Sequence, residues 1–225
     1  MTTPATNRLL YNYQLSTIHY QLSTIHYPLS TAINPMLTVK PRFQTFEDYL
    51  SYDDNSDKLY ELFNGELIEV PPESGLNVEI ATFLLLEFAN LVGYRRVRGH
   101  GLELEVRGEP KNRYPDLTIL REEQIQQLSK RNTIRLSMEP PLLVVEVVSP
   151  GGIQRDRDYI AKRMQYQDCR IPEYWIVDPQ TQTILVLELS GDSYREVGSF
   201  TGEDLVVSSG FRELNLRVSQ VFHGD

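Results

Sequence analysis

The sequence has little cysteine and no long apolar run. Cys169 is the only cysteine in 225 residues, which excludes an internal disulfide and favours a reducing compartment. No segment has the unbroken apolar length of a membrane span, and the N-terminus lacks the basic and apolar regions of a secretory signal. We therefore expect a cytoplasmic protein without a membrane partner.

The chain also has no excess of basic residues. The chain has 22 Lys and Arg against 31 Asp and Glu, a net charge of −9. Phosphate backbones normally attract a basic surface, so this balance alone does not favour a nucleic-acid partner. Short basic clusters at 94–98, 111–113 and 155–163 could form a local footprint. For the first two, solvated charge on loops and helix faces is an equally good interpretation.

The first forty residues differ from the rest. Residues 14–20 read QLSTIHY and residues 21–27 repeat them without change. Two copies are too few for a coiled coil or a solenoid, so His19 and His26 recur only because the repeat does. We expect a low-order N-terminal extension over 1–40 and one domain over 41–225. Met36 opens the domain-like sequence and is a candidate start of translation.

From Thr45 the pattern predicts regular structure. A short capped helix is expected at 45–50, and Asn64-Gly65 between two strands at 59–70 is a strong hairpin signal. Residues 77–92 have the apolar spacing of a mostly buried helix. Further strands are expected near 95–98, 102–106, 116–120, 142–148, 173–178, 182–189 and 193–198, with another short one near Leu205, and a helix at 156–168. The fold class is α/β (α+β), with a mixed central sheet, flanking helices and an N-terminal hairpin.

Two acids stand in or beside these apolar strands. Asp116 opens the strand Asp116–Leu120, and Glu146 lies inside Leu142–Val148, which is apolar on both faces. Alternation puts Val144, Glu146 and Val148 on one face. A carboxylate kept in such a strand needs a cation or strong donors. If the two strands are neighbours, both acids reach one cation, and oxygen ligands select Mg²⁺ or Mn²⁺.

Lys162 lies on the helix that follows the Glu146 strand. An ammonium there could orient water or stabilise a pentavalent transition state. The alternative is an ordinary Asp158–Lys162 surface pair. For Glu146 the alternative is a core carboxylate paired with an arginine, and for Asp116 it is a turn residue after proline.

These residues resemble a known family. Pro115-Asp116 followed by Glu146 in an apolar strand is similar to the PD-(D/E)XK nuclease superfamily. The ordered set around them resembles the Uma-type restriction endonuclease family from about Phe43 to Val218. That set comprises Tyr60-Glu61-Leu62 with Gly65-Glu66-Leu67, Val145 to Pro150, Lys162 with Tyr166, and Glu173 to Asp178.

The resemblance implies a restriction-endonuclease-like core that binds Mg²⁺ or Mn²⁺ through Asp116 and Glu146. Glu61 matches the upstream acid and would be a third acid of the site, unless it faces solvent or pairs with an arginine. The chain departs from the superfamily at Val148, where a lysine is usual. Lys162 matches a lysine that has moved to the next helix, so its role is inferred from position.

The resulting hypothesis is a Mg²⁺-dependent DNA endonuclease that hydrolyses phosphodiester bonds with metal-activated water. Nuclease-like domains that cut both strands are often dimers, so a homodimer is expected by analogy. The alternative is a catalytically inactive nuclease-like domain that binds DNA or protein, which the acidic net charge favours. A two-carboxylate glycosidase does not fit, because no aromatic cluster surrounds the acids.

Overall fold

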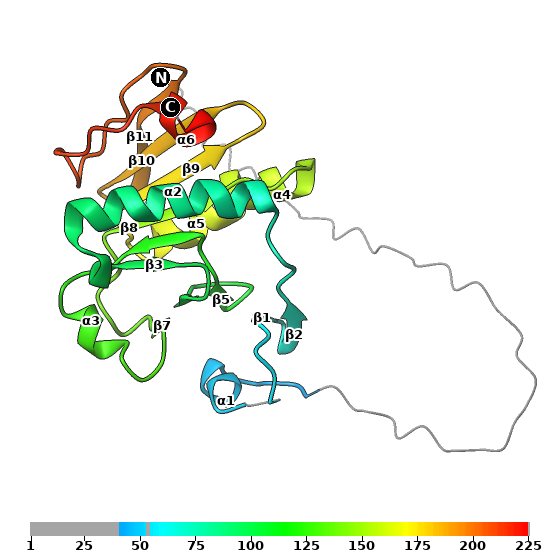
Figure 1. Cartoon of the computed structure of the whole chain (residues 1–225). Helices are drawn as coiled ribbons and strands as arrows, with labels where there is room; N and C mark the ends of the chain where they lie inside the picture. Colours follow the sequence, from blue (N-terminus) through cyan, green and yellow to red (C-terminus); the bar gives the residue numbers. More distant parts are fainter. Residues whose placement is uncertain (1–40, 53–54, 225) are drawn as a thin grey trace, which may run out of the picture. The chain divides into compact units, whose positions relative to one another are not determined.

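The structure is a computed structural model that describes residues 41–52 and 55–224 (Figure 1). The expected extension over 1–40, with its repeat and Met36, lies outside the described residues. The described part begins with α1 (Phe46–Leu50). Thr45 and Asp48 cap this helix reciprocally, each accepting a hydrogen bond from the other's backbone N–H.

The predicted hairpin is present. Strands β1 (Tyr60–Phe63) and β2 (Glu66–Glu69) pair antiparallel. Asn64 and Gly65 connect them with φ angles of 49° and 79°. A two-residue turn that matches strand twist needs positive φ at both positions, and Asn-Gly adopts this at low cost.

A mixed six-stranded sheet forms the centre of the domain, as predicted. Its order is β11-β10-β9-β8-β6-β3. Strands β8 and β9 are parallel, and all other neighbours are antiparallel. The strands are β3 (Val97–Gly99), β6 (Leu117–Ile119), β8 (Leu143–Val147), β9 (Glu173–Asp178), β10 (Thr183–Ser190) and β11 (Ser193–Thr201).

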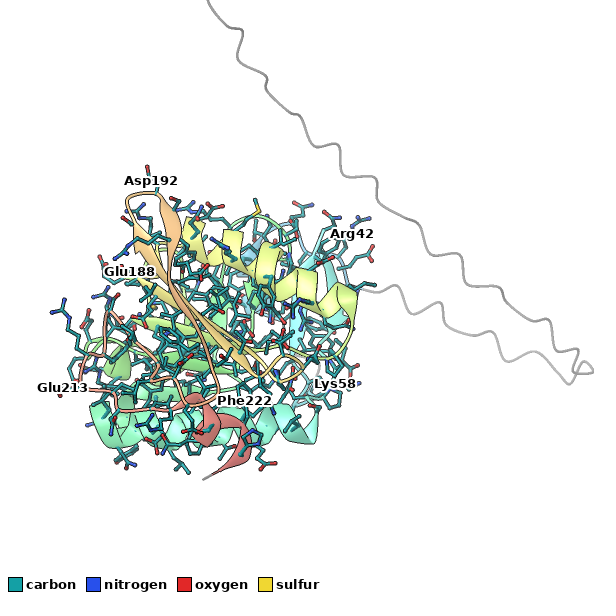
Figure 2. The ribbon with its side chains drawn as sticks, turned by 90° about the horizontal axis from the view of Figure 1, so that it is seen from above. Arg42, Lys58, Glu188, Asp192, Glu213 and Phe222 are labelled. Carbon is teal, nitrogen blue, oxygen red and sulfur yellow. The ribbon has the colours of Figure 1, made fainter. Side chains whose placement is uncertain are left out.

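Helices cover both faces of this sheet (Figure 2). On one face, α2 (Gly75–Val92) and α6 (Val218–His223) pack on a cluster that contains Val145 and Val147 of β8. On the other face lies one helical run of α4 (Gly152–Asp156), the π-helical segment η2 (Arg157–Lys162) and α5 (Arg163–Asp168). Val144 and Val148 belong to that second cluster. The predicted alternation of β8 is therefore confirmed.

A second, smaller sheet was not predicted from the sequence. It has the order β5-β4-β7, with β4 at Glu103–Glu105, β5 at Asn112–Arg113 and β7 at Thr133–Ile134. The polar connector also contains α3 (Gln124–Gln127). The predicted strand at 95–98 is wrong in its first half, where Tyr94–Arg96 forms the 3-10 turn η1. Near Leu205 there is a single bridge to Arg217 rather than a strand.

Helix α2 is a candidate membrane span, contrary to the expectation from the sequence. It has 18 residues with a mean hydropathy of 1.4, which by length and composition alone suffices to cross a membrane. Such a helix is weak evidence, because core helices of soluble proteins share these properties. Ile80, Leu84 and Phe88 of α2 pack in the cluster that covers the central sheet. These residues form the packed side of α2, and 22% of the helix is buried inside the protein.

Candidate metal centre

Asp116 and Glu146 face each other across two neighbouring strands. Leu117 of β6 pairs with Val145 of β8 in antiparallel register, so one step further Asp116 stands opposite Glu146. Asp116 Oδ2 accepts a hydrogen bond of 2.7 Å from the backbone N–H of Val147. Both acids are buried, with exposed fractions of 6% and 1%. The structure therefore brings together the two predicted metal ligands.

Lys162 contacts Glu146 directly. Its Nζ lies 2.8 Å from Glu146 Oε2 and 2.9 Å from Asp158 Oδ1. Tyr166 donates a hydrogen bond to the other oxygen, Glu146 Oε1. Asp158 and Lys162 are both buried, so the surface-pair interpretation does not hold. Both residues lie in the π-helical segment η2, a helix distortion that is common at functional sites.

Burial and mutual repulsion perturb these acids. Burial, together with the charge of Glu146, raises the pKa of Asp116 well above its ordinary value, although Lys162 and the Val147 N–H oppose the shift. Burial also raises the pKa of Glu146, against the attraction of Lys162. For Lys162, burial alone would lower the pKa, but Glu146 and Asp158 raise it above the usual range. The ammonium is therefore kept charged between two carboxylates.

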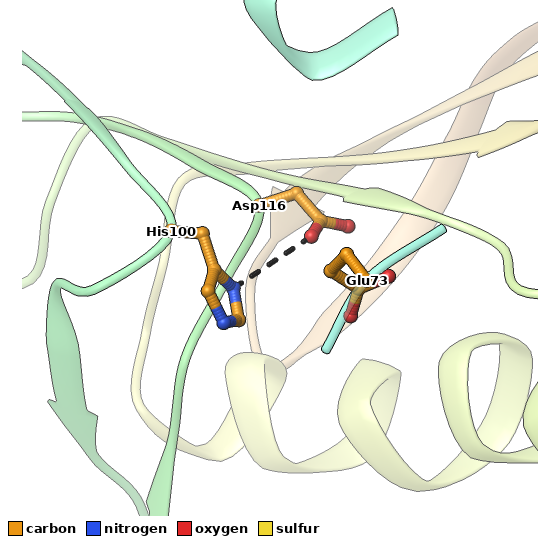
Figure 3. Close-up of side chains that lie close together, drawn as sticks. All are labelled: Glu73, His100 and Asp116. Carbon is orange, nitrogen blue, oxygen red and sulfur yellow. Dashed lines mark ion pairs between the residues drawn. The ribbon is translucent and has the colours of Figure 1, made fainter. Parts of the chain in front are cut away.

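Two further side chains lie near the Asp116 carboxylate, and the sequence did not single them out. Figure 3 shows Glu73, from the loop before α2, and His100, which follows β3, beside Asp116. Each offers one ligand atom, and the three atoms lie within 4.8 Å of one another. His100 Nδ1 is 3.9 Å from Asp116 Oδ1. Burial lowers the pKa of His100 despite the opposing charge of Glu73, which favours a neutral imidazole.

The remaining predicted site residue, Glu61, lies on β1 and pairs with an arginine. Arg113 Nη1 is 3.1 Å from both carboxylate oxygens of Glu61. Gln165 of α5 accepts from Arg113 Nε at 2.8 Å, and Arg113 is buried. This is the arginine-paired arrangement that the sequence left open. A role for Glu61 as a third acid stays a prediction.

Comparison with known proteins identifies a family to which this chain is similar. The Uma2 family, described as "Putative restriction endonuclease", matches residues 46–219. The chain belongs to the Uma2 family. A solved structure of a putative nuclease belonging to DUF820 from Anabaena variabilis ATCC 29413 is similar, with a TM-score of 0.58 and 19% identity. The similarity covers 79% of this chain and 97% of that one. A search of curated proteins found no match.

The predicted family and fold class are thus confirmed: this Uma2 protein is a nuclease-family member with a nuclease-like fold. The Anabaena protein supports the fold alone at this level of identity. Glu173 and Trp175 of β9 are buried, and Trp175 Nε1 donates a hydrogen bond of 2.6 Å to Glu173 Oε1. Glu173 also accepts from Ser208 Oγ at 2.7 Å and the Gly210 N–H at 2.8 Å, which fixes the C-terminal segment on the sheet.

The donor set of this Uma2 site fits a divalent cation. Asp116, Glu146 and Asp158 are buried carboxylates, and Lys162 is the one buried lysine among the described residues. Within the described residues, Asp158 Oδ2 is buried and has no hydrogen-bond partner. An excess of buried negative charge is costly, and a bound cation removes that cost. The assignment of Asp116 and Glu146 as its ligands stays a prediction.

The basic clusters contribute less free charge than the sequence suggested. Arg113 is tied to Glu61, Lys111 lies 2.9 Å from Glu109, and Arg155 pairs with Asp178. Arg157 keeps a raised pKa although burial opposes it, because Asp158 and Glu146 are near. At these positions, local ion pairs account for much of the positive charge.

Glu61→Gln tests whether the hairpin acid supports the fold or the reaction. Gln keeps the shape but removes the counter-charge of buried Arg113, so we expect the free energy of unfolding to fall by about 1–3 kcal/mol. Cleavage by the folded variant should stay within about tenfold of wild type, since both carboxylate oxygens of Glu61 are engaged by Arg113. Urea denaturation and plasmid cleavage measure the two effects. A hundredfold loss of cleavage with unchanged stability would instead assign Glu61 to the metal site.

Proposed function

We propose that this Uma2 protein is a divalent-metal-dependent endonuclease that hydrolyses DNA phosphodiester bonds. The observation that carries the proposal is the opposition of Asp116 and Glu146 across β6 and β8, with Lys162 Nζ 2.8 Å from Glu146. The family match supports a nucleic-acid substrate. The metal, the reaction and a homodimeric state are parts of this proposal.

A divalent ion bound at Asp116 and Glu146 would polarise a phosphoryl oxygen and lower the pKa of a bound water. The chain's own residues do the rest. Val147 N–H holds Asp116 Oδ2, while Oδ1 lies 3.9 Å from His100 Nδ1. Tyr166 and Lys162 hold the two Glu146 oxygens, and Asp158 keeps Lys162 charged. The Lys162 ammonium is thereby positioned to stabilise negative charge that develops on the phosphoryl group.

The second candidate is a nuclease-like domain that binds DNA or protein without cutting it. The net charge of −9 and Val148 at the usual lysine position favour it. Against it stands the buried cluster itself. Three buried carboxylates around one lysine destabilise the fold, and a domain that does no chemistry has no need of them.

The test is cleavage of supercoiled plasmid by the purified full chain with Mg²⁺ or Mn²⁺. We expect nicking that stops when a chelator is added, and a loss of at least about 10²-fold in Glu146→Gln. Glu188→Gln is the matched control, because Glu188 pairs with Arg195 on β10 and β11, away from the acids. Equal cleavage by wild type and Glu146→Gln contradicts the proposal. So does a wild type that nicks no DNA with either ion.

A further inference from the structure

We propose that Glu73 and His100 are additional ligands of the ion held at Asp116, and that the imidazole makes the site select Mn²⁺ over Mg²⁺. This inference rests on the proposed nuclease function and concerns the same site. It changes the expected ligand set, which contained carboxylates of the two strands alone. It also predicts which metal the protein takes from a mixture.

The distances are those of a cation site that needs little adjustment. The three ligand atoms of Glu73, His100 and Asp116 lie within 4.8 Å of one another. In an octahedral site with ligands at about 2.1 Å, adjacent ligands are about 3 Å apart and opposite ones about 4 Å. His100 Nδ1 and Asp116 Oδ1, at 3.9 Å, are too far apart for a hydrogen bond. Their separation is within the range that a shared ion spans.

Asp116 offers an acceptor that the protein leaves unused. Its Oδ2 is bonded to the Val147 N–H, but among the described residues no group donates a hydrogen bond to Oδ1. Asp116 is 94% buried by its exposed fraction of 6%. The charge of a carboxylate in such a buried position is costly, and a cation at Oδ1 offsets that cost. This is the second observation, besides the clustering of ligands, that indicates a bound ion.

The protein holds Glu73 in position rather than leaving it as a free surface acid. Asn77, in the first turn of α2, donates to Glu73 Oε2 at 3.2 Å. The same Nδ2 lies 3.2 Å from Val147 O and 3.1 Å from Ser149 Oγ. Asn77 is 2% exposed. It thus ties the Glu73 loop to the end of β8, the strand that carries Glu146, and acts as a positioning residue.

A pocket is present where these ligands meet. It has a volume of about 100 Å³ and is lined by Glu73, His100 and Asp116 together with residues of α2 that include Val78 and Leu85. This volume holds an ion with several waters. Waters complete the coordination of Mg²⁺ and Mn²⁺ in sites with few protein ligands.

The imidazole decides the selectivity. Mg²⁺ prefers oxygen ligands, whereas imidazole nitrogen suits first-row transition metals. An all-carboxylate site would discriminate little between Mg²⁺ and Mn²⁺. Addition of a nitrogen ligand strengthens Mn²⁺ binding and leaves Mg²⁺ binding nearly unchanged. For the same reason Co²⁺ should bind as well, with visible absorption bands that report the nitrogen ligand.

The test is Mn²⁺ binding to the full chain, followed by the loss of the free Mn²⁺ electron paramagnetic resonance signal, with Mg²⁺ as competitor. We expect wild type to bind Mn²⁺ at least about tenfold more tightly than Mg²⁺. His100→Ala should lose about 10–100-fold in Mn²⁺ affinity and change Mg²⁺ affinity less than about threefold. His100→Asp, which restores an oxygen ligand, should bring the two affinities close together.

His223→Ala is the matched control, because His223 is an exposed histidine on α6, and all variants share the same N-terminal histidines. Equal Mn²⁺ affinity of wild type and His100→Ala overturns this inference, and DNA cleavage in Mg²⁺ would then leave the nuclease proposal standing. Mn²⁺ binding that depends on His100 in a protein that cuts no DNA supports the metal site and removes the nuclease proposal alone. No Mn²⁺ binding by wild type overturns the ligand assignment outright.

Discussion

Lys162→Met is expected to lower the free energy of unfolding by about 3–5 kcal/mol. Lys162 is the buried cation between Glu146 and Asp158, at 2.8 and 2.9 Å. Without it, buried Glu146 loses its ion pair, and Asp158 keeps only Arg157, whose Nε lies 3.4 Å away. At least one of the two carboxylates must then be protonated or pulled toward water. Urea denaturation followed by Trp175 fluorescence measures the change, since Trp175 is the only tryptophan and is fully buried.

Two variants make this result interpretable. Lys111→Met removes a half-buried lysine that pairs with Glu109, and should change stability by no more than about 0.5 kcal/mol. Addition of Glu146→Gln to Lys162→Met removes one of the stranded charges and should recover part of the loss. A Lys162→Met protein within about 1 kcal/mol of wild type contradicts the charge arrangement described here. If Lys162→Met does not fold, the double variant with Glu146→Gln should recover folding. A double variant that also fails to fold contradicts the charge arrangement.

Asp116→Asn is expected to stabilise the metal-free protein while it abolishes cleavage. The pKa of Asp116 is raised, so the folded state holds the proton more strongly than the unfolded state. Stability therefore falls as the pH rises through the shifted pKa, and the charged carboxylate is a cost at pH 8. Asparagine removes the charge and can still accept the Val147 N–H. We expect a gain of about 1 kcal/mol, or about 2–4 °C in Tm, at pH 8.

The gain should shrink toward zero as the pH falls below the ordinary aspartate pKa, about 4, because Asp116 is then protonated in both states. Saturating Mn²⁺ should raise the Tm of wild type and leave Asp116→Asn unchanged, since binding to the folded state alone stabilises it. Cleavage should fall by about 10³-fold or more. Asp192→Asn, in an exposed pair with Arg170, is the control. A variant that loses stability at pH 8 without metal contradicts the account.

Local signals in the sequence were sufficient for most of the fold. Asn64-Gly65 predicted the hairpin because few dipeptides adopt two positive φ angles. The apolar run around Glu146 predicted a central strand with its two faces in different clusters, as observed. The two-residue strands β5 and β7 carry no such signal, because their pairing with β4 depends on tertiary contacts.

Only those residues of the candidate site that lie on neighbouring strands could be predicted from the sequence. Asp116 and Glu146 meet because two apolar strands are neighbours, which the sequence pattern favours. Glu73 and His100 come from separate connections, and no spacing links them to Asp116 before the chain folds. The position of Glu73 directly before Ser74, the N-cap of α2, was a weak signal for a functional acid. The pairing of Glu61 with Arg113 joins residues 52 positions apart, and no local pattern reveals it.

The central claim is that a divalent ion binds at Asp116, in front of Glu146. Anomalous scattering from a crystal of the full chain soaked in Mn²⁺ tests it most directly. The account predicts a peak about 2 Å from Asp116 Oδ1, within reach of His100 Nδ1 and Glu73. Peaks confined to exposed surface carboxylates, with Asp116 Oδ1 unliganded, would contradict it.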